Sequence, residues 1–317
     1  MKRALAASAL ALSLAFPLAA QQAVEPVTPS SVVAAAGAEE WVKIPPEDML
    51  VMELAPDARG DERTVVIQLM QPPFSQPWVE NIRTLAEAHW WDGTSIYRVQ
   101  DNYVTQWGDV TEEKALPDGL VSPEASFWSR HDEALFPGLP HPTRDSVSGL
   151  LQAANSSRYD TFYKGFPVSG EDGIHDYGTM WPIYCYGYIG VARDYAPDTG
   201  TGAELYTIIG QPQRHMDRNL AVVGRVIEGM EHLSSLPRGS GELGFYTEEE
   251  ADLRTPIRSV RLASEMADPP AFEYLDTASE SFARYVEVRA NRNDAFYTVP
   301  AGGVDVCSVQ VPVRRAG

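Results

Sequence analysis

The sequence predicts a mainly β domain whose strands close into a barrel. Short runs rich in valine, isoleucine and tyrosine recur along the chain, turn residues separate them, and only about two convincing helical stretches intervene. The chain has 317 residues, of which 44% are hydrophobic and 22% charged, so it is a folded globular protein rather than a disordered one. No internal repeat is visible.

Residues 1–20 have the layout of a cleaved export signal. Lys2 and Arg3 precede a short apolar run, Ala4 to Phe16, which Pro17 breaks before the small pair Ala19-Ala20. An ordinary N-terminal core helix is the alternative, but a core helix would carry polar residues on one face. We therefore expect a periplasmic protein. No cysteine follows the small residues, which argues against a lipid anchor.

Residues 21–46 are rich in alanine, valine, proline and serine without apolar periodicity, and we expect a linker there. Two strands, 49–54 and 64–69, then predict a hairpin. A helix is expected over 78–90, because Ile82, Leu85 and Ala86 share one face.

Later segments continue the alternation of short strands and turns. Further strands are expected at 95–99, 103–106, 187–192, 204–209, 221–226 and 257–263, with less distinct ones at 285–290 and 304–313. A short helix is expected over 228–236. Between 110 and about 181 the pattern dissolves apart from a possible helix at 146–154, which indicates an insertion.

The charge of the chain excludes several kinds of partner. The formal net charge is −19 and the pI is near 4.7, so the surface repels phosphate backbones and anionic lipids. Beyond the signal no stretch approaches the ~20 apolar residues of a membrane helix. We expect neither a nucleic acid nor a membrane as partner of the mature chain.

Cys185 and Cys307 are the only cysteines. In an oxidising compartment they can pair, and the bond would join the C-terminal tail to the main domain. Two separate buried thiols are the alternative. Two cysteines alone cannot complete a tetrahedral metal site.

The motifs of common enzyme chemistries are missing. The six histidines show no H-x-x-x-H spacing, and there is no G-x-S-x-G, P-loop or G-x-G-x-x-G segment. The sequence therefore points to no metal and no cofactor. What stands out is Arg98, inside a β-type alternation of apolar neighbours, where a half-buried guanidinium needs a partner. A surface or salt-bridged arginine is the alternative.

The segment around Arg98 resembles the signature of the cyclophilin family. Residues 91–99 (WDGTSIYRV) and 103–109 (YVTQWGD) are similar to the family's D-G-T-x-F-H-R-V and F-x-x-Q-G-G-D. Further matches, in the family's order, are Val79-Glu80-Asn81, the segment 198–208, and His215-Met216-Asp217 with 222–230. The resemblance covers about 47–110 and 185–265.

The resemblance implies an eight-stranded antiparallel barrel capped by two helices. This cyclophilin-like domain would span 47–265 with the insertion at about 110–181, and a C-terminal extension would occupy 266–317. The implied activity is peptidyl-prolyl cis-trans isomerisation of proline-containing polypeptides. That reaction requires no nucleophile, metal or cofactor, only an environment that stabilises the twisted bond more than the planar one.

The resemblance also assigns residues. Arg98 matches the catalytic arginine and Gln106 the glutamine that positions it. The matching substrate-binding positions are Tyr103, Val104, Ala192, Arg193, Glu204, Tyr206, His215, Met216 and Leu220. Glu204 stands where the family has glutamine, and its carboxylate could pair with Arg98. Trp107 and Leu220 depart from the family pattern too.

Two functions of different classes follow. The first is an isomerase, expected as a monomer, that assists the folding of exported polypeptides. The second is a non-catalytic cyclophilin-like module or periplasmic chaperone that binds proline-containing segments, favoured by the departures at Glu204, Leu220 and Trp107. Seven tryptophans suggest a carbohydrate-binding or hydrolytic protein, but no motif accompanies them.

Overall fold

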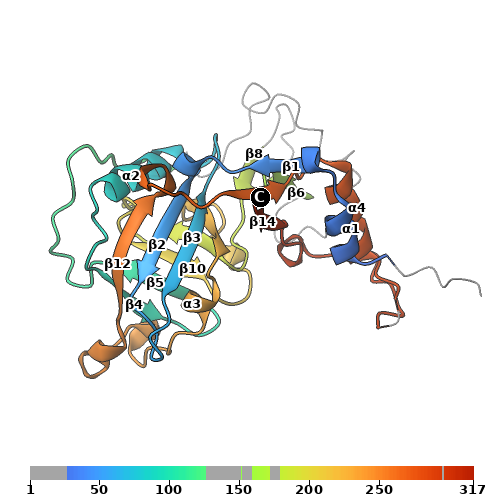
Figure 1. Cartoon of the computed structure of the whole chain (residues 1–317). Coiled ribbons are helices and arrows are strands. Elements are labelled where there is room, and N and C mark those ends of the chain that lie inside the picture. The colour runs from blue at the N-terminus through green and yellow to red at the C-terminus, as the bar shows by residue number, and fades with distance from the viewer. Residues whose placement is uncertain (1–26, 126–150, 152–158, 172–178, 295) are drawn as a thin grey trace, which may run out of the picture.

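The computed structural model describes residues 27–125, 151, 159–171, 179–294 and 296–317. The expected signal peptide and nearly all of the helix expected over 146–154 lie outside these ranges. Figure 1 shows a strand-rich body on one side and a smaller part with two helices on the other. No helix among the described residues is long and apolar enough to cross a membrane.

Eight antiparallel strands close into a barrel, as the sequence predicts. Their order is β10-β5-β4-β12-β2-β3-β11-β9, and each strand pairs antiparallel with both neighbours. The strands are β2 (Met49–Leu54), β3 (Arg63–Leu69), β4 (Ser95–Val99), β5 (Val104–Gly108), β9 (Tyr188–Val191), β10 (Leu205–Ile208), β11 (Val222–Glu228) and β12 (Thr255–Leu262). Consecutive residues of β2 are buried, so both faces of this strand are covered.

Two helices accompany the barrel. Helix α2 (Gln76–Glu87) packs against β11 and β12 through an apolar face that includes Trp78, Ile82 and Leu85. Helix α3 (Glu231–Ser234) is a single turn beside β3 and is shorter than the predicted 228–236. The apolar spacing of α2 explains why the sequence located it to within a few residues.

The insertion contains a three-stranded sheet that was not expected from the sequence. Strands β6 (Tyr159–Tyr163), β7 (Phe166–Glu171) and β8 (Thr179–Pro182) pair in sequence order. Lys164 and Gly165, both with positive φ, make the two-residue turn between β6 and β7. Two residues with positive φ are typical of a tight β-hairpin turn, so the Lys-Gly pair was the feature of the sequence that could have indicated this hairpin.

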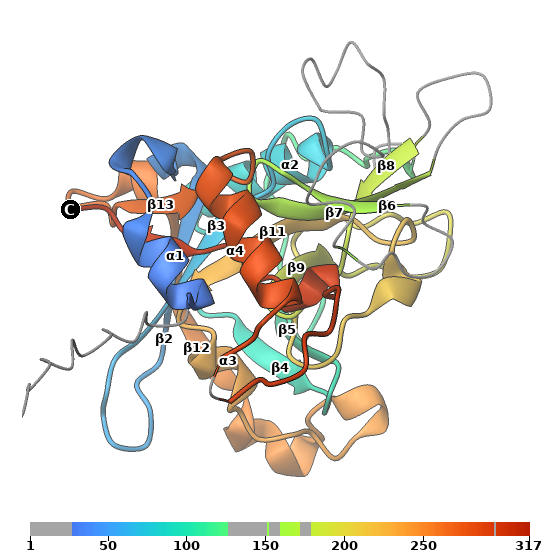
Figure 2. The same ribbon diagram turned by 90° about the vertical axis from the view of Figure 1, so that its right-hand side faces the viewer.

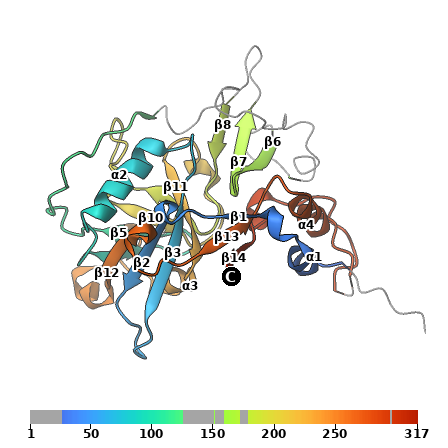
Figure 3. The same ribbon diagram turned by 45° about the horizontal axis from the view of Figure 1, so that its top comes forward.

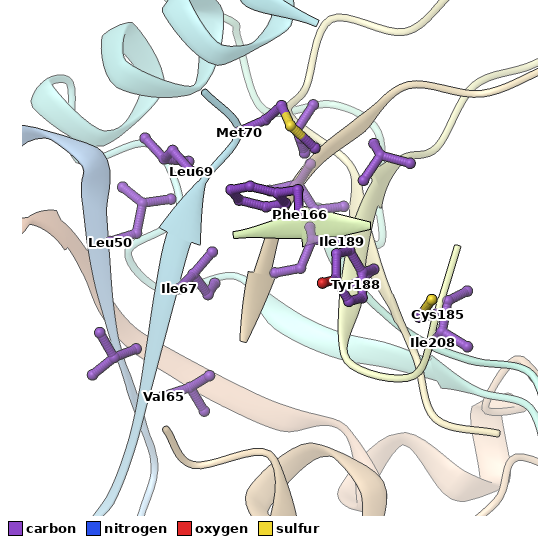
Figure 4. Packing of buried hydrophobic residues seen from close by; sticks show 14 of the residues in the cluster. Leu50, Val65, Ile67, Leu69, Met70, Phe166, Cys185, Tyr188, Ile189 and Ile208 are labelled. Atoms are coloured by element: carbon purple, nitrogen blue, oxygen red, sulfur yellow. The ribbon is translucent and has the colours of Figure 1, made fainter. Parts of the chain in front are cut away.

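This sheet lies between the barrel and the smaller part of the molecule (Figure 3). On one side Phe166 meets Tyr188 of the barrel edge to face, with ring centroids 6.2 Å apart. On the other side Phe162 meets Phe282 of the smaller part at 5.0 Å. Figure 4 shows Phe166 beside Met70 and Tyr188, within one continuous core.

The smaller part, which we call the extension, combines segments from both ends of the described chain. It contains α1 (Pro29–Ala35), β1 (Trp41–Lys43), β13 (Phe272–Leu275), α4 (Glu280–Ala290) and β14 (Val313–Arg315), and its sheet has the order β1-β13-β14. Helices α1 and α4 lie side by side (Figure 2). The predicted linker is therefore wrong for residues 27–46, which form α1 and β1. The partner of β1 is β13, more than 200 residues further along the chain.

Two predictions for the C-terminal region are also wrong. Residues 285–290 belong to α4, whose buried side chains Phe282, Tyr285 and Val286 repeat at the helical i, i+3, i+4 spacing. Residues 304–313 hold a 3₁₀ turn at Val306–Ser308, and a strand begins only at Val313. The bond between Cys185 and Cys307 is present, so the predicted disulfide is confirmed and the two-thiol alternative is excluded.

Candidate active site

A concave pocket of about 630 Å³ opens on the barrel where β4, β5 and β10 meet the loop after β9. It gathers nearly all the residues that the sequence assigned to the site. Those lining it are Tyr103, Val104, Arg98, Gln106, Ala192, Arg193, Glu204, Tyr206, Met216 and Leu220. His215 does not line the pocket; it is exposed at the rim and stacks on the ring of Tyr103, 6.2 Å away.

Three acceptors hold the guanidinium of Arg98. Its Nη1 donates to Gln106 Oε1 at 2.9 Å, its Nη2 to Gln100 Oε1 at 2.6 Å, and its Nε to the carbonyl of Leu243 at 2.8 Å. The charge also lies over the ring of Phe245, 5.1 Å from the centroid. Burial lowers the pKa of Arg98, but an arginine remains protonated at neutral pH.

A bulge in β4 sets this geometry. Ile96 pairs with Trp107 of β5, but the register then shifts and Arg98, not Tyr97, stands opposite Gln106. In a regular strand adjacent side chains point to opposite faces, whereas a bulge re-aims one of them. As a result, the neighbours Tyr97 and Arg98 both line the pocket.

An apolar recess lies beside Arg98. Val104, Tyr206 and Met216 are almost fully buried in its walls, while Tyr103 is half-buried. The hydroxyls of the two tyrosines have partners: Tyr103 Oη contacts Met216 Sδ at 3.0 Å, and Tyr206 Oη donates to Tyr184 Oη at 2.9 Å. The recess therefore presents ring faces and aliphatic groups to a small apolar ring.

Comparison with protein families identifies this arrangement. Residues 64–261, more than half of the chain, match the model of the family described as Cyclophilin type peptidyl-prolyl cis-trans isomerase/CLD. The chain belongs to the cyclophilin family. It is an isomerase of the cyclophilin type, and its closed eight-stranded barrel agrees with this family assignment.

Solved structures support the fold. A cyclophilin from Hirschia baltica, AquaCyp293, is similar over 91% of this chain and 97% of its own, with a TM-score of 0.64 and 20% identity. A cyclophilin type isomerase from Cryptosporidium parvum, solved in the presence of the dipeptide Ala-Pro, covers 67% of this chain and 98% of its own. Its identity to this chain is 12% and the TM-score is 0.36. No curated protein matches the sequence.

In this cyclophilin Glu204 does not pair with Arg98, contrary to the expectation from sequence. Its carboxylate accepts a hydrogen bond from Tyr97 Oη at 2.5 Å and another from the backbone N–H of Asp109 at 2.8 Å. Burial raises the pKa of Glu204 to about 7, although these two hydrogen bonds oppose the shift. Among the described residues, no carboxylate forms an ion pair with Arg98.

Several residues of the pocket were not assigned from the sequence, among them Tyr97, Leu243 and Phe245 in its lining and Gln100, which accepts from Arg98. Tyr97 stands where the family signature has histidine, and that difference was a visible signal. Leu243 and Phe245 come from the loop between α3 and β12, which runs along β4 and donates from Tyr246 N to the carbonyl of Tyr97. No local pattern marks such a loop as part of a site.

Proposed function

We propose that Arg98 is the catalytic residue of this isomerase and that Gln106 positions it. A guanidinium has five N–H groups, and the three hydrogen bonds to Gln106, Gln100 and Leu243 leave two of them for a substrate. The single observation that supports this proposal most strongly is the position of this held, charged donor beside the apolar recess.

The chemistry of the X-Pro bond explains what the donor would do. Rotation has a barrier of ~18–20 kcal/mol because the amide is conjugated. In the twisted transition state the prolyl nitrogen loses conjugation and gains a lone pair. A hydrogen bond from Arg98 to that nitrogen stabilises the twisted state more than the planar one, which lowers the barrier in both directions.

The remaining lining residues would hold the substrate. Tyr103, Val104, Tyr206, Met216 and Leu220 would receive the proline ring, because burying its methylene groups against their apolar surfaces is favourable. Ala192 and Arg193, on the loop after β9, would line the groove for the neighbouring residues of a polypeptide. His215 would contribute indirectly, by fixing the ring of Tyr103.

We also propose that the protein is exported and assists the folding of exported polypeptides. The signal-like N-terminus supports export. The bond between Cys185 and Cys307 is a second support, because disulfides persist mainly in oxidising compartments such as the periplasm.

Substitution of Arg98 tests the catalytic proposal. Isomerisation of an Ala-Pro peptide is measured for the protein without residues 1–20, for Arg98→Ala and for Arg98→Lys. We expect Arg98→Ala to lower kcat/KM about 100-fold, the usual loss for a transition-state donor, and Arg98→Lys to recover only a small part. Arg59→Ala, on an exposed turn, is the control and keeps the wild-type rate.

Circular dichroism of each variant checks that the barrel is intact. An Arg98→Ala protein that is folded and as active as the wild type contradicts the assignment. A wild-type protein that binds the peptide without accelerating isomerisation contradicts the catalytic proposal itself and supports a binding module instead.

A further inference from the structure

Arg98 lies at one end of a chain of hydrogen bonds that crosses the pocket. Its Nη1 donates to Gln106 Oε1 at 2.9 Å, and Gln106 Nε2 donates to Tyr97 Oη at 2.7 Å. Tyr97 Oη then donates to Glu204 Oε2 at 2.5 Å. We call these four side chains the relay. It ends on Glu204, whose other oxygen accepts from the N–H of Asp109.

Each hydrogen bond of the relay can run in one direction only. Arg98 is purely a donor, so the amide of Gln106 must present its oxygen to Arg98 and therefore its nitrogen to Tyr97. The hydroxyl of Tyr97 must then accept from Gln106 and direct its own proton to Glu204. This direction requires an acceptor at the far end, and an ionised carboxylate provides one.

The setting of Glu204 is confined. A Cβ atom on Gly108 would lie 1.9 Å from Glu204 Oε2, so only a glycine leaves room for the carboxylate at this position. The groups that bear on its charge are Tyr97 on β4 and the carboxylates of Asp109 and Glu112 after β5. Burial raises the pKa of Glu204 to about 7, and these two carboxylates add to the increase.

Protonation of Glu204 disrupts the direction of the relay. Oε1 is occupied by the N–H of Asp109, so an acid proton on Oε2 points at Tyr97 Oη. The phenol then receives donors from both Glu204 and Gln106, and its own proton has no acceptor left within the relay. Gln106 then competes with Glu204 for one phenol oxygen that no longer donates to a carboxylate, so the hydrogen bond that fixes its amide is weaker.

We propose that Tyr97 and Glu204 are positioning residues, which fix the amide of Gln106 and through it the guanidinium of Arg98 when Glu204 is ionised. The proposal rests on the proposed catalytic role of Arg98. Both residues act only through their effect on Arg98. Because they hold Arg98 when Glu204 is ionised, the proposal implies an isomerase that is more active on the alkaline side of the Glu204 titration.

The dependence of kcat/KM on pH tests the proposal, with an Ala-Pro peptide that carries no titratable group. The wild-type value should fall about tenfold as the pH falls through about 7, with KM changing little. In Glu204→Gln the amide has one oxygen where the carboxylate has two, so Tyr97 and the N–H of Asp109 cannot both keep their acceptor atom, and the profile should be flat and near the acid limit of the wild type. Tyr97→Phe, which cuts the relay, should also be flat.

Glu113→Gln is the matched control, since Glu113 is an exposed carboxylate on the loop after β5 and only its backbone is hydrogen-bonded to a neighbour in the described structure. It should keep the wild-type inflection. An inflection near pH 7 that survives Glu204→Gln overturns the proposal.

Nuclear magnetic resonance separates this inference from the proposed function, because it needs no turnover. The carboxyl carbon of Glu204 should titrate near pH 7, and the side-chain nitrogens of Arg98 should follow the same curve in the wild type but not in Tyr97→Phe. If Glu204 titrates while the Arg98 signals stay constant, the relay is wrong even if the enzyme is active. If the signals move together in an inactive protein, the relay holds and the catalytic role fails.

Discussion

At the scale of single residues, close packing of side chains against a glycine sets the position of one pocket wall. The phenols of Tyr184 and Tyr206 stack with ring centroids 5.9 Å apart, and both hydroxyls lie over Gly190 of β9. A Cβ atom on Gly190 would lie 2.4 Å from Tyr206 Oη, so a larger residue would displace this wall. The position of the recess is thus coupled to one glycine of the barrel.

The Tyr184–Tyr206 hydrogen bond gives a prediction about stability. Tyr206→Phe leaves the buried hydroxyl of Tyr184 without the proton it accepts, and we expect the free energy of unfolding to fall by about 1–2 kcal/mol. Removing both hydroxyls should recover most of that loss, since two apolar rings then pack together. Urea unfolding of the two single variants and the double variant measures the coupling, and strictly additive losses would contradict it.

At the scale of elements, the sheet β6-β7-β8 supports the wall of the pocket. Asp160 of β6 is buried and accepts a short hydrogen bond from Ser169 of β7. Arg214 donates to Ser169 Oγ at 2.5 Å and to Asp217 Oδ2 at 2.7 Å. Arg214 and Asp217 flank Met216, so the buried network of the insertion fixes a turn that lines the recess.

Asp160→Ala tests this support. It leaves the guanidinium of Arg214, whose side chain is only 10% exposed, without one of its two carboxylates. We expect the free energy of unfolding to fall by about 3 kcal/mol, as for other broken buried ion pairs, and KM for a prolyl peptide to rise more than kcat falls. Asp268→Ala, an exposed carboxylate, should change stability by less than about 0.5 kcal/mol. A KM equal to that of the control would contradict the coupling.

At the scale of the whole molecule, the extension is fastened to the barrel at several points. The disulfide joins Cys307 to Cys185, which follows β8, and Arg315 of β14 forms an ion pair with Glu228 of β11. The guanidinium of Arg225 lies over the rings of Phe166 and Tyr274, between the barrel and the two smaller sheets. These contacts combine the three sheets into one body.

The disulfide and the expected signal give one prediction for the protein in its cell. The chain recovered from a periplasmic extract should begin near Gln21 by mass spectrometry and carry the Cys185–Cys307 bond. Since the cysteines are 122 residues apart, replacing both by serine should lower the free energy of unfolding by about 2–5 kcal/mol. Reductant should destabilise the wild type but not this variant. A cytoplasmic chain with free thiols would contradict the export proposal.

The sequence predicted the barrel well because each strand is a short run of β-branched and other apolar residues bounded by turn residues, and the expected bounds of β2, β3, β4 and β12 agree with the structure to within two residues. It failed where partners are distant: Trp41 of β1 pairs with Leu275, and no pattern near either residue indicates the other. In the site, motif matches located Arg98 and Gln106. The role of Tyr97 depends on a bulge, and Phe245 arrives on a loop that only the tertiary structure brings to the pocket.

The composite extension has a consequence for the order in which the molecule is made. During synthesis from the N-terminus, α1 and β1 are made first. Their partners, α4 and β13, are made only after the last barrel strand. The barrel can therefore close while α1 and β1 still lack their partners. Only a complete chain can form the extension. A chain terminated after the last barrel strand would contain every residue that lines the pocket but would leave β1 unpaired.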